Sequence, residues 1–168
     1  TGINLGNQAS DAMNFGSLTF NSGGVVNISE ASVMQLAGMS TADRLVLAST
    51  GNITNDAGAN LAVSNNATFS GTGINLGNQA SDAMNFGSLT FKGGDVVNIS
   101  EDSVMELAGM STVDRLVLAS TGNITNAAGA NLAVSNNATH RRTGHKECKQ
   151  ASEPLNRGHL GGNRGEVL

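Results

Sequence analysis

The chain contains a tandem repeat that covers most of its length. Residues 1–68 recur as residues 72–139, and only seven of the 68 aligned positions differ. Long tandem repeats are typical of solenoids, in which each unit contacts only its neighbours and a continuous core is buried by stacking. The repeat therefore predicts an elongated, stacked architecture. The differing pairs are Asn21/Lys92, Ser22/Gly93, Gly24/Asp95, Ala31/Asp102, Gln35/Glu106, Ala42/Val113 and Asp56/Ala127.

Within each copy, short apolar–x–apolar units alternate with clusters of Gly, Asn, Ser and Asp. Alternation with period two marks a strand with one buried face, and the intervening residue types favour turns. Nine such units per copy divide into three rungs of about 24 residues. We therefore predict an all-β parallel β-helix, with about three rungs per repeat and about six in all. The side chains predicted to point inward include Val26, Ile28, Leu45, Leu47, Leu61, Val63 and Phe69, and none of the seven differences falls on a predicted inward position.

Stacking every third strand aligns six asparagines on one outer face. Each lies between two core positions, as in Ile-Asn-Leu or Val-Asn-Ile, so its side chain is expected to point outward. Identical amides about 4.8 Å apart can form a hydrogen-bonded ladder. The predicted surface ladder comprises Asn4, Asn27, Asn52, Asn75, Asn98 and Asn123. A second, flatter face aligns Thr19, Val46, Thr68, Thr90, Val117 and Thr139.

The repeat pattern stops after Thr139. We predict a solenoid over residues 1–139, made of copies 1–71 and 72–139, and a basic tail of low order over residues 140–168. The solenoid carries a net charge of −7 and the tail +3, so the repeats lack the clustered cations that nucleic-acid binding requires. No apolar run approaches the roughly 20 residues of a membrane helix, and we expect no membrane insertion. The tail holds His140, His145, Cys148 and His159, whose spacing matches no established zinc pattern.

Little in the repeats resembles a catalytic site. Residues 1–139 contain neither His nor Cys, and their carboxylates fall mainly at predicted turns. The adjacent pair Asp43-Arg44, which recurs as Asp114-Arg115, is interpreted as a structural turn pair. Calcium binding near Glu101, Asp102 and Glu106 is the alternative to a solvated turn there. We predict no catalytic residue, no cofactor and no metal site.

The segment from Leu45 to Phe69, LVLASTGNITNDAGANLAVSNNATF, resembles the repeats of filamentous-haemagglutinin-like and autotransporter-passenger proteins, and so does its copy. Similarly, GSLTF at residues 16–20 with VNISE at residues 26–30 resembles repeats of very large exported bacterial surface proteins. The resemblance covers residues 1–139. It implies a right-handed β-helix, export, and a role in adhesion or surface structure, and it carries over no functional residue.

The sequence thus predicts a non-catalytic structural or adhesive repeat segment of a large exported bacterial surface protein, located at the cell surface or outside the cell. A carbohydrate-active β-helix enzyme and a carbohydrate-binding module are the alternatives. Surface glycans or other cell-surface proteins are the expected partners, and uncapped ends predict self-association. Because the chain opens in the middle of the pattern at Thr1, we interpret it as a fragment of something longer.

Overall fold

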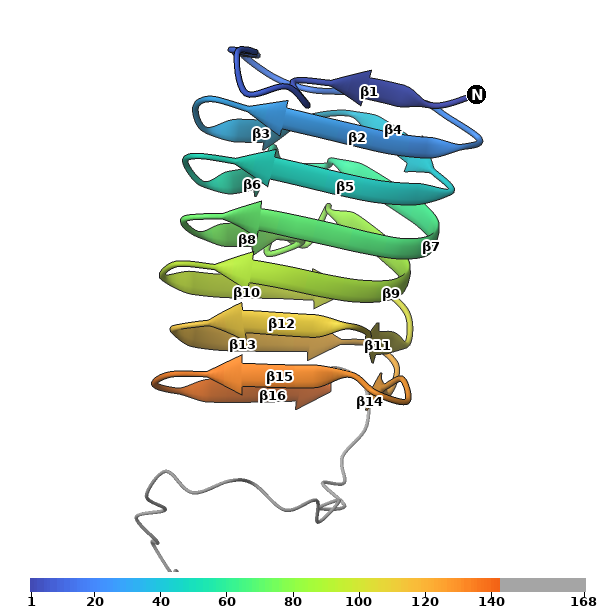
Figure 1. The fold of residues 1–168 in the computed structure, drawn as a ribbon. Coiled ribbons are helices and arrows are strands. Elements are labelled where there is room, and N and C mark those ends of the chain that lie inside the picture. The colour runs from blue at the N-terminus through green and yellow to red at the C-terminus, as the bar shows by residue number, and fades with distance from the viewer. Residues whose placement is uncertain (143–168) are drawn as a thin grey trace, which may run out of the picture.

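A computed structural model describes residues 1–142 of the chain. These residues form 16 strands and no helix, and the chain winds as a parallel β-solenoid of about seven turns, each about 21 residues long. The N-terminal turn lies at one end of the stack and β16 at the other (Figure 1). The prediction of an all-β parallel β-helix is confirmed. The strands are β1 (Ile3–Leu5), β2 (Val25–Glu30), β3 (Met34–Leu36), β4 (Met39–Ala42), β5 (Arg44–Ser49), β6 (Ile53–Asn55), β7 (Asn60–Gly71), β8 (Ile74–Leu76), β9 (Ala83–Gly93), β10 (Val96–Glu101), β11 (Met105–Leu107), β12 (Met110–Val113), β13 (Arg115–Ser120), β14 (Ile124–Asn126), β15 (Asn131–Val134) and β16 (Ala138–Arg142).

Strands pair with strands of the neighbouring turns, on both sides inside the stack and on one side for strands such as β1 and β16 at its ends. One sheet contains six strands in the order β16-β13-β10-β8-β6-β3, and the other contains ten and includes β1, β2, β5, β7 and β9. β7 and β9 are long because each runs round a corner of the solenoid; their pairing shifts register between Val63 and Asn66. Backbone groups are therefore satisfied along the axis of the stack, while side chains alternate between core and surface.

The inward side chains form one continuous apolar core between the sheets. All seven side chains named above as inward-pointing are buried, with at most 4% of their surface exposed. Phe69 and Phe86 meet edge to face, with ring centroids 5.6 Å apart. Since burial of such side chains is the main favourable term in folding, this column of apolar residues holds the turns together.

The structure has shorter turns than the sequence analysis predicted. The prediction missed β4 and its repeat β12, because their inward residues are small. In β4 these are Ser40 and Ala42, both buried. The Ser40 hydroxyl accepts a hydrogen bond from the Phe20 N–H at 3.2 Å, which explains why a polar residue is tolerated there. Ala42 is replaced by Val113, also buried, so this difference between the copies falls on an inward position that the prediction had not recognised.

The two copies keep the same internal pairing but occupy different sheets. In the first copy, Asn4, Asn27, Val46 and Thr68 stack one per turn in the ten-stranded sheet. Their counterparts in the second copy stack in the same order in the six-stranded sheet. Asn75, the counterpart of Asn4, lies about a third of the way along the turn that leads from Thr68 to its stacking partner Thr90. The second copy is therefore rotated by about a third of a turn relative to the first.

The solenoid extends slightly beyond the predicted boundary at residue 139. β16 continues to Arg142 and pairs with β13, so that His140 lies opposite Leu118. The segment 140–142, which was assigned to the tail, thus belongs to the last turn. The rest of the predicted tail, including His145, Cys148 and His159, lies outside the described residues.

The repeat provides a matched test of core packing. Phe86 is buried where the copies meet, whereas its counterpart Phe15, in the same local sequence, is half-buried in the first turn. Phe86→Ala should lower the free energy of unfolding by about 3–5 kcal/mol, the usual cost of emptying a buried phenylalanine site. Phe15→Ala should cost less than half as much. Urea denaturation of both variants measures the difference; equal losses would contradict the packing described here.

Candidate functional site

The six asparagines of the predicted ladder do not form one column. Asn4 is stacked on Asn27, but the next residue in that column is Val46. In the second copy, Asn75 is stacked on Asn98, and Val117 follows. The prediction of a single six-residue ladder was wrong, and two separate asparagine pairs replace it.

The error lies in the register. From Asn27 the next turn is short and already closes at Val46, whereas the prediction placed Asn52 there. Val46 had been assigned to the second predicted face, together with the threonines. In the structure, residues of both predicted faces stack in one column, with Asn27 on Val46 and Val46 on Thr68. Asn52 and Asn123 instead lie just before β6 and β14, where their carbonyl oxygens accept hydrogen bonds from the N–H groups of Met34 and Met105.

Three of the six asparagines nevertheless surround one groove on the β6–β8–β10 face. This groove has a volume of about 350 Å³. The Asn75 Oδ1 atom is buried there without a hydrogen-bond partner, and the Asn52 side chain lies close to Gly73, whose missing Cβ leaves it room. The lining residues are Asn52, Thr54, Gly73, Ile74, Asn75, Asp95, Val96 and Asn98.

Amide and carboxylate groups of this kind can donate to and accept from hydroxyl groups. An unpartnered buried acceptor such as Asn75 Oδ1 costs free energy, and a ligand in the groove would satisfy it once the Asn75 side chain turned that oxygen toward the groove. The groove is therefore the best-placed candidate binding surface for a polyhydroxylated ligand such as a sugar chain. It offers no aromatic stacking surface, because its lining among the described residues contains none.

A larger groove of about 570 Å³ lies at the corner where β2 and β5 begin. It contains Arg44 and Glu106, but the Asn66 amide in it already has protein partners. Asn66 donates to the Thr68 hydroxyl at 2.9 Å and accepts from the Ser88 hydroxyl at 3.0 Å. The contact with Ser88 joins neighbouring turns, so this amide has a structural role.

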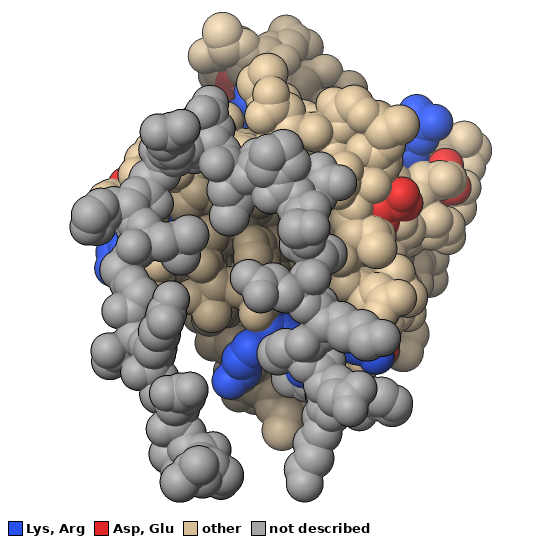
Figure 2. Space-filling model, turned by 90° about the horizontal axis from the view of Figure 1, so that it is seen from below, with Lys and Arg blue, Asp and Glu red and all other residues tan. Residues whose placement is uncertain are grey.

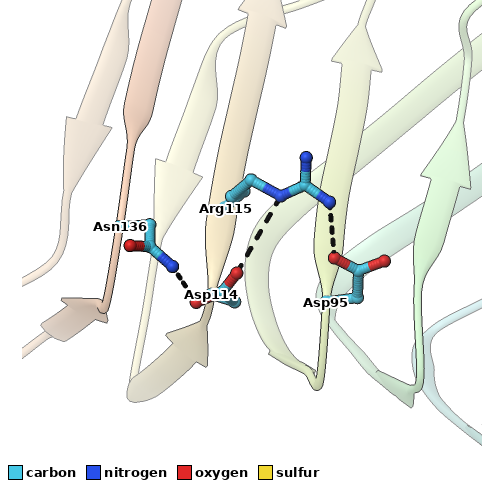
Figure 3. Close-up of polar contacts among 4 residues, drawn as sticks. All are labelled: Asp95, Asp114, Arg115 and Asn136. Atoms are coloured by element: carbon cyan, nitrogen blue, oxygen red, sulfur yellow. Dashed lines mark hydrogen bonds and ion pairs between the residues drawn. The ribbon is translucent and has the colours of Figure 1, made fainter.

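A chain of polar contacts links three turns of the second copy along one corner (Figure 3). The Arg115 guanidinium lies 2.7 Å from Asp95 and 3.9 Å from Asp114, and Asn136 donates to Asp114. The hydrogen bond and charge of Asp95 raise the pKa of Arg115. Because Asp95 replaces Gly24, this ion pair has no counterpart in the first copy, where Asn65 donates to Asp43 at 2.7 Å. Both Asp-Arg pairs lie at corners of the stack, in keeping with the predicted structural interpretation.

Two glutamates that the sequence placed in solvated turns are buried. Glu30 and Glu101 continue the inward alternation of β2 and β10 by one more step, a signal that could have revealed them. Glu101 Oε1 accepts from the Phe86 N–H and the Ser103 hydroxyl, both at 2.9 Å. In each glutamate Oε2 is buried without a partner. The carboxylates thus satisfy backbone donors at a corner of the solenoid.

The environment of Glu101 perturbs its titration. Burial raises its pKa and the charge of neighbouring Asp102 adds to the rise, while the hydrogen bonds from Phe86 and Ser103 oppose it. Asp102 stands where the first copy has Ala31. The calcium alternative finds no support around this residue, since no group of three or more acidic, His or Cys side chains within residues 1–142 is arranged to hold a metal ion.

Comparison of the chain with protein-family models, with curated proteins and with solved structures finds no match. Across residues 1–142 there is no helix long and apolar enough to cross a membrane. The resemblance to haemagglutinin-like repeats therefore stays a prediction from the sequence, and the architecture rests on the strand pairing described above.

The raised pKa of Glu101 predicts a pH effect on stability. A carboxyl whose pKa is higher in the folded than in the unfolded state stabilises the fold most below its unfolded pKa, and this contribution is lost as the pH rises through the folded pKa. Asp102→Ala should lower the folded pKa of Glu101 and reduce that loss. Carbon-13 NMR titration of the carboxyl and unfolding measured from acid to neutral pH test this.

Glu101→Gln serves as the control, because it keeps an acceptor for Phe86 but cannot titrate. In the Glu101→Gln background, Asp102→Ala should change the pH dependence of the free energy of unfolding only through the loss of the Asp102 carboxyl itself. An unchanged Glu101 titration after Asp102→Ala would contradict the electrostatic interpretation.

Proposed function

We propose that this chain is a non-catalytic structural and adhesive segment of a large exported bacterial surface protein. The observation that carries the proposal is that both copies keep one internal register while they stack without interruption. A unit that stacks on its own copy is suited to building length. At about 4.8 Å per turn, each copy adds about 16 Å to the rod.

The roles of the acidic residues support a non-catalytic segment. Asp43 and Asp114 bind asparagines of the next turn, Asp95 pairs with Arg115, and Glu101 accepts a backbone amide. Side chains that already serve the fold are poorly placed to act as a general acid and base pair, which need access to the substrate and different environments.

Export rests on the resemblance to haemagglutinin-like repeats, and the composition is compatible with it. The only cysteine, Cys148, lies outside the repeats, so the solenoid needs no particular redox environment. We infer a location at the cell surface or outside the cell. Antibody labelling of intact and permeabilised producing cells tests this: labelling restricted to permeabilised cells would contradict it.

We assign the adhesive role to the groove around Asn75 and Asn98, and we propose surface glycans as its ligands. The unpartnered Asn75 Oδ1 atom favours this groove over the larger one, where Asn66 is already paired. The same observation also favours the second candidate function, a carbohydrate-binding module. A carbohydrate-active enzyme is the remaining alternative.

The repeat supplies a matched control for the groove. We expect the full chain to bind a subset of immobilised bacterial and host glycans, and the double variant Asn75→Ala/Asn98→Ala to bind about tenfold or more weakly, equivalent to about 1.4 kcal/mol of lost hydrogen bonding. Asn4→Ala/Asn27→Ala removes the same stacked pair from the other sheet and should leave binding unchanged.

The outcomes separate the candidate functions. Glycan binding that is lost equally in both double variants would reject the groove as the site. Release of new reducing ends or unsaturated sugars from a polysaccharide by the chain would support the enzyme instead. Absence of binding to every glycan would remove the adhesive part and leave a structural rod.

A further inference from the structure

The two end faces of the described stack repeat the two halves of an interface that exists inside the molecule. Within the chain, the first turn of the second copy rests on the last turn of the first copy. Because the copies are nearly identical, the first turn of the first copy and the last turn of the second present the two halves of that interface again.

The internal junction is the most extensive strand pairing in the described part of the chain. β7 and β9 pair over ten residue positions, from Asn60 opposite Ala83 to Gly71 opposite Gly93. Beside them, Ile53 and Thr54 of β6 pair with β8. The junction also contains the edge-to-face contact of Phe69 with Phe86.

Polar contacts fix the register of the junction. The Asp82 carboxylate accepts hydrogen bonds from Asn55 Nδ2 and Gly58 N, both at 2.9 Å, across the boundary between the copies. Asn55 Oδ1 in turn accepts from Gly77 N at 2.9 Å. The counterpart of Asp82 in the first turn, Asp11, accepts from Gln8 N at 3.1 Å, a contact within its own turn. The Asp11 carboxylate can still accept the two hydrogen bonds that Asp82 accepts from Asn55 and Gly58 across the junction.

Equivalent apolar residues are buried at the junction and exposed at the ends. Leu76 is fully buried, whereas its counterpart Leu5 in the first turn is 39% exposed. Leu61 is 1% exposed, whereas its counterpart Leu132 in the last turn is 36% exposed. Residues 12–22, which repeat most of β9, form only isolated bridges in the first turn. β9 pairs with β7 of the preceding turn, whereas residues 12–22 have no such strand beside them in the described part of the chain.

We propose that copies of this chain stack head to tail, with residues 3–22 of one copy resting on residues 124–142 of another in the register of the internal junction. Asp11 of one copy then accepts from Asn126 and Gly129 of the other, as Asp82 does from Asn55 and Gly58. The interface joins different surfaces and repeats the rotation of about a third of a turn, so it generates an open helical filament. This inference rests on the junction geometry and goes beyond the proposed function.

The residues that depart from the repeat are compatible with this contact. Ser70 pairs with Lys92 inside the molecule, and the equivalent pair between copies is Arg141 with Asn21. The neutral Asn21 thus stands opposite Arg141, where a lysine, as at Lys92, would bring two positive charges together. His140 replaces Phe69 and would lie beside Phe20 of the neighbouring copy.

Figure 2 views the C-terminal end of the stack, where most of the visible surface of the described residues carries no charge. A second copy of this chain is the favoured occupant because it brings the matching register, the acceptor at Asp11 and the apolar residues of the first turn, such as the exposed Leu5.

The test blocks each end separately. Leu5→Asp places a charge on the N-terminal face and Leu132→Asp on the C-terminal face; both side chains are already exposed, and circular dichroism should confirm that each variant is folded. In sedimentation velocity, we expect the wild-type chain to form oligomers that grow with concentration. Each variant alone should stay monomeric at concentrations at least tenfold higher, and an equimolar mixture of the two should form a dimer.

This mixture distinguishes head-to-tail stacking from other association. Association through two like ends would let one variant dimerise alone and would yield no new species on mixing. Nonspecific aggregation would be insensitive to the pairing of variants. Either result, or a monomeric wild-type chain up to millimolar concentration, would overturn the proposal.

The register has its own test. Asn75 lies beside Thr54 at the internal junction, so Asn4 should lie beside Thr125 of the next copy. In a Cys148→Ser background, Asn4→Cys/Thr125→Cys should cross-link between copies under mild oxidation, since neighbouring strands bring the Cα atoms within disulfide range. Asn4→Cys/Asn136→Cys, with the second cysteine at a different corner, should not. Equal cross-linking by both pairs would reject the register.

A gain-of-function variant completes the test. His140→Phe restores the residue that the first copy has at the junction and should lower the concentration at which oligomers form. No shift, or a shift to higher concentration, would contradict the placement of His140 beside Phe20.

Discussion

The hydrogen-bonded ladder between successive turns is the constraint on which the rest of this structure depends. Parallel strands held about 4.8 Å apart align the inward side chains of every turn in columns. Each column must therefore be apolar or satisfied by hydrogen bonds over its whole length. Ser40 and Glu101 are polar and inward, and each accepts a backbone amide that the irregular corner leaves unpaired, although the second carboxylate oxygen of Glu101 has no partner. A polar residue at an inward position without such an amide would have no comparable compensation.

The length of the repeat imposes a second condition. Because one copy is not a whole number of turns of about 21 residues, the same sequence has to work on two different sheets. The strand Ile3–Leu5 begins the ten-stranded sheet, while its copy Ile74–Leu76 lies within the six-stranded one. Sheets with different preferences could not accept the same strand. Most of the differences between the copies accordingly lie on the outside. Two are inward: Val113 replaces Ala42, and Gly93 replaces Ser22 at a position where a Cβ would lie 3.3 Å from the Val113 side chain, so neither change adds a polar group to the second copy.

What could be predicted from the sequence follows from what period-two alternation encodes. It reports which face of a strand is buried, and the inward assignment of residues such as Val26 and Phe69 was confirmed. It does not report how many residues the corners use. The short turn from Asn27 to Val46 was therefore unpredictable, and the single asparagine ladder failed with it. Strands with small inward residues, such as β4, carry a weak apolar signal. The groove around Asn75 depends on the register across turns, so the sequence alone could not locate it.

The rotation between copies also determines in which direction each copy presents its outward side chains. The asparagine pair of the first copy, Asn4 and Asn27, lies in one sheet, and the pair of the second, Asn75 and Asn98, lies in the other. Any feature that depends only on the repeated sequence therefore winds round the rod, displaced by about a third of a turn with each copy. In a longer rod built from such copies, equivalents of the groove around Asn75 and Asn98 would be displaced by about a third of a turn at each junction between copies. Multivalent contact with a flat surface would accordingly use every third groove, because three rotations of about a third of a turn return it to its original direction. Lengthening the rod therefore increases its reach, while the grooves face about three directions in all.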